Sequence, residues 1–329
     1  MRAARRPTMK DVAALAGGSL STVSRVVNDS PVDPALAGRV HEAVRRLGYR
    51  RDAAAAGLRR ADRATASVGL IVDDVANPFF SAVHRGLEDV ARAHGVLIFA
   101  GSSDDSAEQE RELVTSFSAH VVDGLVIVPA GDDHRYLERE RDAGVPIVFL
   151  DRPPQRFVAD TVLSDNAGGM RAAAEHLRAA GHTRIAFLGD RTRVWTATER
   201  LAACRGIVAP DLVRMDVSDS GATVRELLDS PDPPTALLCG QNQITVGALH
   251  ALRELGHQVA VVGFDDLPLG ALVGVTVVAQ DPVALGRHAA ELLFARLEGD
   301  NGPPRTIVVP TRLIVRDAIP AAPRSRQSA

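Results

Sequence analysis

The sequence predicts an α/β protein in which a small helical N-terminal domain precedes two lobes, each built on a doubly wound parallel sheet. Short helical patterns separated by glycine turns fill the first 50 residues. From about residue 66, near-continuous apolar runs alternate with amphipathic helical stretches, as in strands that a parallel sheet buries on both faces. A chain of 329 residues is also long enough for two or three domains.

Cysteine content and hydropathy exclude several classes of protein. The two cysteines, Cys204 and Cys239, show no CxxC or Cys/His spacing, which fits a reducing compartment and argues against a structural zinc site. No apolar run reaches the roughly 18 residues of a membrane span. The basic N-terminus "MRAARRPTMKD" also lacks the apolar stretch of a signal peptide. We therefore expect a cytoplasmic protein that does not contact a membrane.

The net charge of −3 hides an asymmetry between the N-terminal region and the rest of the chain. Residues 1–64 hold 13 Lys and Arg against 6 Asp and Glu, a net charge of +7, whereas the remainder holds 25 against 35, a net charge of −10. A small basic domain on a large acidic body favours a polyanionic partner for the basic domain. A solvated basic tail is the alternative interpretation.

Three short helices with identifiable start and stop residues are predicted in the basic region. Thr8 and Asp11 have the spacing of a capping box, and Gly17-Gly18 ends this first helix. Ser19 caps a second helix, and Asp33-Pro34 is a cap followed by the first-turn proline of a third. Because only a tight glycine turn joins the first two helices, the pair is predicted to form a helix-turn-helix.

The second helix, around "STVSRVVN", has two sides of different character. Val23, Val26 and Val27 fall on one side, where they can face a small core, while the opposite side carries short polar residues and one arginine, Arg25. Short side chains let a helix approach base edges in the major groove, and an arginine can reach O6 and N7 of a guanine. A helical bundle with a solvated polar face is the alternative. The predicted DNA contacts in this region are Lys10, Ser19, Leu20, Ser21, Thr22, Ser24, Arg25 and Asn28.

The motif "MKDVAALAG.S.STVSRVVN", followed by "VHEAVRRLGYR", resembles the headpiece of the lactose-repressor (LacI/GalR) family, and the similarity continues to about residue 317. This resemblance implies a transcriptional regulator, a repressor, that binds a near-palindromic double-stranded DNA operator as a homodimer. It divides the chain into a headpiece (1–50), a hinge (51–65), a two-lobed effector-binding and dimerisation domain (66–317) and a disordered tail (318–329). The lobes are expected at about 66–160, with a late strand crossing back, and at 161–290.

The same resemblance places a DNA-contacting hinge in "RRDAAAAGL". It assigns Ala55 and Leu58 to the central minor groove, where the leucines of two subunits wedge apart a base step and kink the duplex. Arg51, Ala56 and Gly57 depart from the family's hinge pattern, and a glycine inside a helix costs up to about 1 kcal/mol. These departures favour weaker specific binding than is typical of the family.

Motifs of enzymes that are built on doubly wound sheets do not occur in the sequence. The dinucleotide fingerprint G-x-G-x-x-G, the phosphate loop G-x-x-x-x-G-K-[ST], the G-x-S-x-G elbow and H-E-x-x-H are all missing. Adjacent acids such as Asp265-Asp266 are common at strand ends. We therefore expect no catalytic residues, no cofactor and no metal. An enzyme on a doubly wound scaffold is the alternative interpretation.

Polar and aromatic residues cluster at the predicted strand ends, where doubly wound sheets bind their ligands. These ends carry Asn77-Pro78-Phe79-Phe80, Asp151-Arg152, Asp265 and Gln280, and Arg200 follows another strand in "TERLA". Carboxylates, amides and guanidiniums can bind paired hydroxyls, and an aromatic ring can pack on the C–H face of a sugar. The observations favour a neutral polyol as ligand. Packing within a lobe for the two phenylalanines, and surface pairing for the charges, are the alternatives.

The body also resembles periplasmic sugar-binding proteins, especially those of the ribose type, in "NPFF", "LDR", "ERLA", "VGFDD" and "QDP". At "GQNQITVGAL" the family usually has Asn-Asp where this chain has Gln241-Asn242. The resemblance implies that a sugar closes the lobes and changes operator affinity, and a secreted sugar-binding protein is the remaining rival. The implied effector contacts are Asn77, Phe79, Phe80, Asp151, Arg152, Arg200, Gln241, Asp265 and Gln280.

Overall fold

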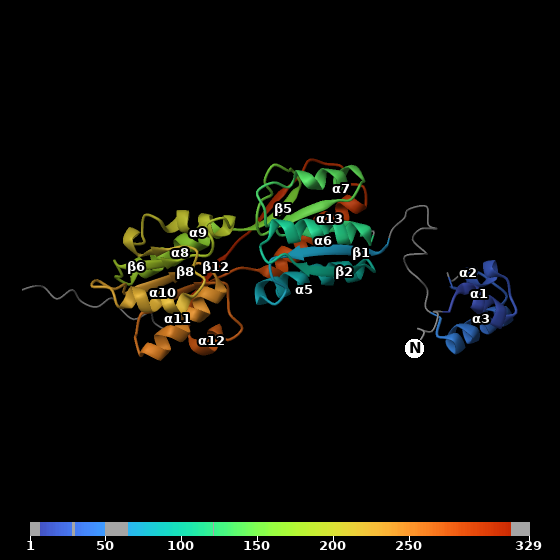
Figure 1. Ribbon diagram of the computed structural model, residues 1–329, viewed down its shortest axis with the longest axis horizontal. Coiled ribbons are helices and arrows are strands. Elements are labelled where there is room, and N and C mark those ends of the chain that lie inside the picture. Colours follow the sequence, from blue (N-terminus) through green and yellow to red (C-terminus); the bar gives the residue numbers. More distant parts are fainter. Residues whose placement is uncertain (1–6, 28–29, 50–64, 121, 317–329) are drawn as a thin grey trace, which may run out of the picture. The chain divides into compact units, whose positions relative to one another are not determined.

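The computed structural model describes residues 7–27, 30–49, 65–120 and 122–316, and the chain divides into two compact units, residues 1–65 and 66–329. We call the first unit the headpiece and the second the body. Asn28, the hinge residues Ala55 and Leu58, and the tail 318–329 lie outside the described residues. Figure 1 shows the order of the helices and strands.

The headpiece contains the three predicted helices, α1 (Met9–Ala16), α2 (Leu20–Val27) and α3 (Pro34–Leu47). The capping box at the start of α1 is confirmed, since the Asp11 carboxylate accepts a hydrogen bond of 2.7 Å from the Thr8 amide while the Thr8 side chain accepts from the Asp11 amide. Gly17 ends α1 with a φ of 62°, and Asp33 caps α3 by accepting from two amides of its first turn. Each helix boundary therefore follows from side chains close to it in the sequence.

The headpiece core is small and lies between the three helices. Val23 and Val26 are buried as predicted, which leaves the polar side of α2 facing away from the core. Leu15 of α1 is apolar but 45% exposed. At about 100° per residue, Leu15 lies roughly 100° around α1 from the centre of the buried face, which Val12, Ala13 and Ala16 form.

The body contains two six-stranded sheets, with strand orders β11-β5-β4-β3-β1-β2 and β12-β10-β9-β8-β6-β7 (Figure 1). The strands within each sheet pair in parallel, except that β12 runs antiparallel to β10. The predicted fold class, a helix-turn-helix headpiece with two parallel-sheet lobes, is confirmed. The apolar runs that predict strands are "VGLIV", "VLIFAG", "DGLVIVPA", "VPIVFLD", "RIAFLGD", "TALLCG" and "VAVVGF". All seven occur, as β1, β2, β3, β4, β6, β8 and β9, whereas the short strands β5, β7, β10, β11 and β12 were not expected.

We call the two halves of the body the first and the second lobe. The first lobe has the strands β1 (Ser67–Val72), β2 (Leu97–Ser102), β3 (Gly124–Ile127), β4 (Ile147–Leu150), β5 (Asp160–Ser164) and β11 (Thr306–Val309). Its helices are α5 (Pro78–Ala93), α6 (Ala107–Ala119), η1 (Arg135–Leu137), α7 (Glu138–Asp142) and α13 (Pro282–Leu297). The second lobe has the strands β6 (Ile185–Leu188), β7 (Val213–Arg214), β8 (Ala236–Cys239), β9 (Ala260–Phe264), β10 (Thr276–Ala279) and β12 (Arg312–Ile314). Its helices are α8 (Asn166–Ala179), α9 (Trp195–Cys204), η2 (Pro210–Leu212), α10 (Ser220–Leu228), α11 (Asn242–Leu255) and α12 (Gly270–Val273).

Alternate residues of each strand pack into separate cores on the two faces of each sheet. In the first lobe, one core joins the sheet to α5 and α13, and the other joins it to α6 and η1. In the second lobe, α8 and α9 cover one face while α10 and α11 cover the other. Burial on both faces explains why the inner strands are apolar throughout rather than alternating.

The division between the lobes differs from the predicted one at both ends of the second lobe. Strand β5 pairs with β4 in the first sheet, so that lobe extends to residue 164 rather than 160. Helix α13, of which residues 282–290 were expected in the second lobe, packs on α5 of the first. The chain thus crosses between the lobes after β5, after β10 and between β11 and β12. A local apolar pattern shows that a strand is buried but not which sheet it joins.

Two glycines allow α5 and α13 to cross at close range. A Cβ atom on Gly86 would lie 2.1 Å from the carbonyl oxygen of Val283, and one on Gly286 would lie 2.0 Å from that of Val83. Both distances are far shorter than a van der Waals contact, and the atoms that a Cβ would meet belong to the rigid backbone. The crossing holds together two helices whose first turns carry Phe79 and Pro282.

We expect Gly286→Ala to destabilise the body, because its methyl group would overlap the Val83 carbonyl and force the helices apart. Overpacking of this kind costs roughly 1–3 kcal/mol, which exceeds the gain of up to about 1 kcal/mol in helix propensity. Denaturant unfolding measures the change. The control is Gly206→Ala, where a Cβ would meet nothing within 4 Å. Equal stability of both variants would show that the crossing can relax.

Candidate DNA-binding surface and ligand cavity

The predicted DNA contacts of α2 gather on its exposed side, near its first turns. Leu20, Ser21 and Arg25 are exposed, while Thr22 and Ser24 are half-buried. The hydroxyl of Ser19 caps the helix by accepting from the Thr22 amide at 3.1 Å, and it lies 2.7 Å from the Ser21 hydroxyl. Lys10 is exposed on the first turn of α1. Short hydroxyl side chains at a helix start, with one arginine a turn later, suit an approach to base edges.

The body contains a cavity of about 410 Å³ to which both lobes contribute. Of the predicted effector contacts, Phe79, Asp265 and Gln280 line it. Its size falls within the range of ordinary small-molecule sites. Its lining residues are Pro78, Phe79, Ala82, Asn242, Asp265, Asp266, Leu267, Pro268, Gln280 and Pro282.

Asp265 provides the buried carboxylate of this cavity. It follows β9 directly and has a φ of 70°, a left-handed conformation that costs energy outside glycine. Burial raises the pKa of the Asp265 carboxyl above its usual value, while the Arg200 charge and a 2.5 Å hydrogen bond from Gln280 Nε2 act in the opposite direction. The other amide atom, Gln280 Oε1, is buried and has no hydrogen-bond partner in the segments that the structure describes.

Asp151 occupies the corresponding position in the first lobe. It follows β4, has a φ of 65° and is 5% exposed, and its Oδ1 has no hydrogen-bond partner among the described residues. Burial raises the pKa of this carboxyl, and the charges of Arg152 and Arg200 lower it. Asp151 lies outside the lining of the cavity, but its charge is close enough to act on Asp265.

Arg200 carries the positive charge between these two aspartates. Its guanidinium donates to Asn166 Oδ1 at 2.8 Å and to the Gly240 carbonyl at 2.7 Å, and its central carbon lies 3.7 Å from the ring centre of Phe264. Burial lowers the pKa of Arg200, while Asp265 and Asp151 raise it. Arg200 therefore balances the buried carboxylates without lining the cavity itself.

Asn242 lines the cavity in place of its predicted neighbour, Gln241. Gln241 is the N-cap of α11, and its side chain accepts from the Gln243 amide at 2.7 Å. Asn242 is buried, and its Nδ2 donates across the lobes to Asn77 Oδ1 at 2.8 Å. Its Oδ1 is buried and has no hydrogen-bond partner within the described part of the chain. The sequence could have shown this difference. If Gln241 caps the helix, Asn242 is its first residue, and the two side chains then point in different directions.

Two further predicted contacts lie elsewhere in the first lobe. Phe80 is buried in the core beside Phe79, with ring centres 5.0 Å apart, and it lines no part of the cavity. Arg152 donates to Asp105 at 2.5 Å and to the Pro129 carbonyl at 3.1 Å. The alternative of packing within the lobe therefore holds for Phe80, and Arg152 belongs to an ionic network outside the cavity.

The described part of the chain has neither a membrane-crossing helix nor a metal-binding cluster. No helix in it is both long and apolar enough to cross a bilayer. It also holds no group of three or more His, Cys, Asp or Glu side chains placed to bind a metal ion.

Two family models match the chain. Residues 8–52 match the model for bacterial regulatory proteins of the lacI family, and residues 174–319 match a periplasmic binding protein-like domain. The first match covers the helix-turn-helix, and the second covers most of the second lobe together with α13, β11 and β12.

Relatives match over almost the whole chain. The HTH-type transcriptional regulator KdgR of Bacillus subtilis is 30% identical over 95% of this chain and 97% of its own, and CelR of Thermobifida fusca is 33% identical over 97% and 100%. The lac repressor dimer bound to operator and the anti-inducer ONPF has 26% identity and a TM-score of 0.80, covering 95% of this chain and 98% of that one. With both family models and this identity along its length, the chain belongs to the LacI family of bacterial regulatory proteins and is a helix-turn-helix transcriptional regulator rather than an enzyme.

Proposed function

We propose that this regulator is a repressor whose operator affinity is controlled by a neutral sugar bound in the cavity between the lobes. The observation that carries the proposal is the set of hydrogen-bond acceptors at one end of the cavity. Asn242 Oδ1 and Gln280 Oε1 are buried beside the Asp265 carboxylate, and neither has a hydrogen-bond partner among residues 7–27, 30–49, 65–120 and 122–316. A buried acceptor left unpaired costs about 1–3 kcal/mol, so a ligand that brings neighbouring hydroxyl donors binds favourably here.

The remaining lining favours a sugar over a charged ligand. No lysine or arginine is among the lining residues, and the two acids that are, Asp265 and Asp266, oppose an anion. Asp266 is paired with Arg316 at 2.8 Å, so the charge that faces the cavity is that of Asp265. Phe79, Leu267 and three prolines supply apolar surface for the C–H face of a sugar ring. A phosphate ester would need surplus positive charge, which the lining residues do not supply.

Solved relatives support a sugar ligand. A LacI family regulator from Enterococcus faecalis was solved with bound ribose, and CelR was solved as a cellobiose complex. These two ligands differ in size, so they support the class of ligand and not its identity for this chain. The effector contacts that we propose are Phe79, Asn242, Asp265 and Gln280 at the cavity, with Asn77, Asp151 and Arg200 supporting them.

For DNA binding, we propose that two headpieces of a homodimer each read half of a near-palindromic operator through α2. The lac repressor structure is a dimer on its operator, which supports this arrangement. Each lobe also exposes apolar side chains that a second copy would cover, among them Leu97 (69% exposed) on the edge strand β2 and Leu272 (82%) on α12. Ala55 and Leu58 remain the proposed minor-groove contacts. Because its partner is chromosomal DNA, the protein acts in the cytoplasm.

Arg25→Ala should lower affinity for an operator selected from random DNA by roughly 1–3 kcal/mol, because one arginine–guanine contact is lost in each half-site. Preference at a single position of each half-site should relax at the same time. Fluorescence anisotropy against singly substituted operators measures both effects. Lys10→Ala serves for comparison, since a phosphate contact weakens all sequences alike. A uniform loss for Arg25→Ala would make it a phosphate contact as well.

Calorimetry against a panel of neutral sugars, sugar phosphates and nucleobases should find one neutral sugar that binds. Asp265→Asn should abolish or strongly weaken that binding, because the amide has one acceptor oxygen where the carboxylate has two, and it lacks the negative charge that strengthens hydrogen bonds from hydroxyls. The same sugar should shift operator affinity in the wild-type protein. Binding of phosphate esters alone, or a sugar response that ignores Asp265, would contradict the proposal.

Variants of two neighbouring residues test which of them contacts the sugar. Asn242→Ala should weaken sugar binding by about tenfold or more, because it removes a buried acceptor that faces the ligand. Gln241→Ala should leave sugar affinity nearly unchanged and should only lower stability by about 1 kcal/mol through loss of the helix cap. Calorimetry and thermal unfolding report the two quantities separately. The reverse order of effects on affinity would restore Gln241 as the contact.

A further inference from the structure

Outside the cavity, one aspartate of the first lobe is held by three arginines. Asp105 lies in the loop between β2 and α6, is 3% exposed and has a φ of 57°. Its Oδ1 accepts from Arg152, a residue of the same lobe, at 2.5 Å. Neither residue lines the ligand cavity. The proposed sugar site therefore does not account for this cluster.

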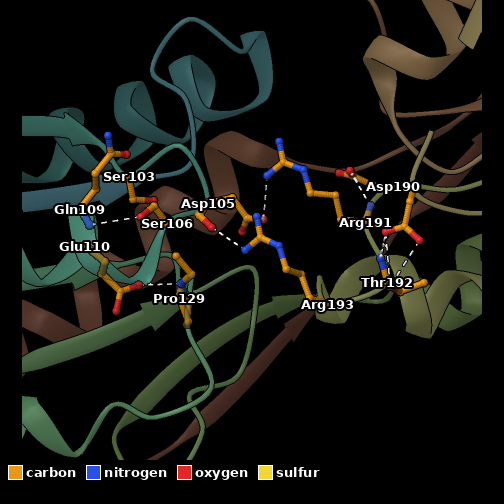
Figure 2. Close-up of polar contacts among 12 residues, drawn as sticks. Ser103, Asp105, Ser106, Gln109, Glu110, Pro129, Asp190, Arg191, Thr192 and Arg193 are labelled. Carbon is orange, nitrogen blue, oxygen red and sulfur yellow. Dashed lines mark hydrogen bonds and ion pairs between the residues drawn. The ribbon is translucent and has the colours of Figure 1, made fainter. Parts of the chain in front are cut away.

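The other two arginines come from the second lobe, from the loop between β6 and α9. Arg193 donates to the Asp105 backbone carbonyl at 2.6 Å and places Nη2 2.9 Å from Oδ2 of the same residue. Arg191 Nη1 lies 3.2 Å from that Oδ2. Figure 2 shows both arginine side chains extending from their loop toward Asp105. These contacts join the lobes directly.

The first-lobe end of this contact is anchored to its own lobe. The Ser103 amide donates to the Val72 carbonyl at 2.8 Å, and Ser106 caps α6 through the Gln109 amide (Figure 2). Asp105 is thus held between a strand end and a helix start, in a backbone conformation that favours one side-chain direction.

The second-lobe end is anchored in a similar way. The Thr192 amide donates to Asp216 at 2.9 Å, and the Arg191 amide donates to the Asp190 side chain at 2.7 Å. Anchored loops lose little entropy when their charged side chains meet, so the ion pairs retain more of their strength than pairs between mobile side chains.

We propose that Asp105, Arg191 and Arg193 form an interlobe clamp that holds the body closed before any ligand binds. Opening the lobes would leave the buried Asp105 carboxylate with Arg152 alone and would break the bond from Arg193 to the backbone. Removing the charged partners of a buried carboxylate costs free energy. The clamp therefore favours the closed body. Because the cavity is lined from both lobes, the closed body is also the form that is complete for the ligand.

Resting on the proposed function, the clamp also sets how the regulator responds. Clamp and sugar favour the same closed form, and the apparent ligand affinity falls in proportion to the fraction of molecules that are closed. Loss of the clamp therefore weakens sugar binding. It also shifts the operator affinity of the ligand-free protein in the direction opposite to the shift that the sugar produces.

The test compares Asp105→Asn with Asp104→Asn in the full chain. Asparagine accepts the left-handed conformation that both positions require, at a φ of 57° and 50°, so the backbone is preserved. Asp104 is the exposed neighbour and takes no part in the clamp. Dyes on Glu108→Cys and Arg205→Cys, at exposed positions of the two lobes, report lobe separation by energy transfer. The native Cys204 and Cys239 are buried, which limits labelling to the introduced cysteines.

Without ligand, Asp105→Asn should lower the ratio of closed to open molecules by about three- to tenfold, whereas Asp104→Asn should not change it. Arg193→Gln should open the body more than Arg191→Gln, since Arg193 also binds the backbone. Raising KCl from about 0.05 to about 0.5 M should open the wild type but not Asp105→Asn, because salt screens the exposed arginines.

The clamp would be overturned if energy transfer were unchanged in both Asp105→Asn and Arg193→Gln while both variants still melted cooperatively. This conclusion would hold for any measured operator affinity. An opened body with unchanged operator affinity would support the clamp and would instead contradict the coupling of closure to DNA binding in the proposed function. Opening together with the opposite-signed shift in operator affinity supports both.

Discussion

Buried ionisable side chains lie where the lobes meet, and the rest of the body depends on how their charges are balanced. Asp151, Arg152, Arg200 and Asp265 are each less than 9% exposed. Removing such charges from water costs several kcal/mol for each, and only close partners of opposite sign offset that cost. Arg200 stands between Asp151 and Asp265, and Arg152 binds Asp105. The closed arrangement of the two lobes is therefore an electrostatic requirement as much as a matter of shape.

The two aspartates mark the same physical position in both lobes. Each follows a central strand of its sheet and turns the chain with a φ of 65° or 70°, which aims its carboxylate across the strand ends. Strained backbone of this kind persists only where the surrounding structure determines it. The amides of both residues donate to a carbonyl of a neighbouring strand at 2.8 Å, Asp151 to Val162 and Asp265 to Val278. The strained backbone of each aspartate is thus held in place by a hydrogen bond to the neighbouring strand of its sheet.

How much of this could be predicted from the sequence depends on the range of the interaction that decides each feature. Helix starts at Thr8 and Asp33 could be predicted, because capping involves residues two or three positions apart. That Asp265, Phe79 and Gln280 line the cavity could be predicted, because the carboxyl ends of parallel strands meet at one side of a sheet. The membership of α13 could not, since it is decided by packing on α5, more than a hundred positions earlier along the chain, and that of β5 depends on pairing with both β4 and the distant β11.

The site residues that differ from the prediction do so for a related reason. Gln241 and Asn242 are adjacent in the sequence, yet the first caps α11 while the second faces the cavity, and only the direction of the helix distinguishes them. Arg152 has the right residue type for a sugar contact, but Asp105 occupies its guanidinium. A motif identifies which residues could bind a ligand. It does not show which of them the protein has already used to pair its own buried charges.

The cavity and the clamp divide the body's two tasks between different kinds of chemistry. Acceptors of moderate strength and apolar walls line the cavity, so they can distinguish ligands by the placement of hydroxyl groups. Charged pairs hold the lobes at a separate position, so they act on closure without contacting a ligand. Since neither set shares a residue with the other, a substitution in the clamp shifts the balance between open and closed forms while the lining of the cavity stays intact. Selectivity for the ligand and sensitivity to its concentration are therefore separable properties of this fold.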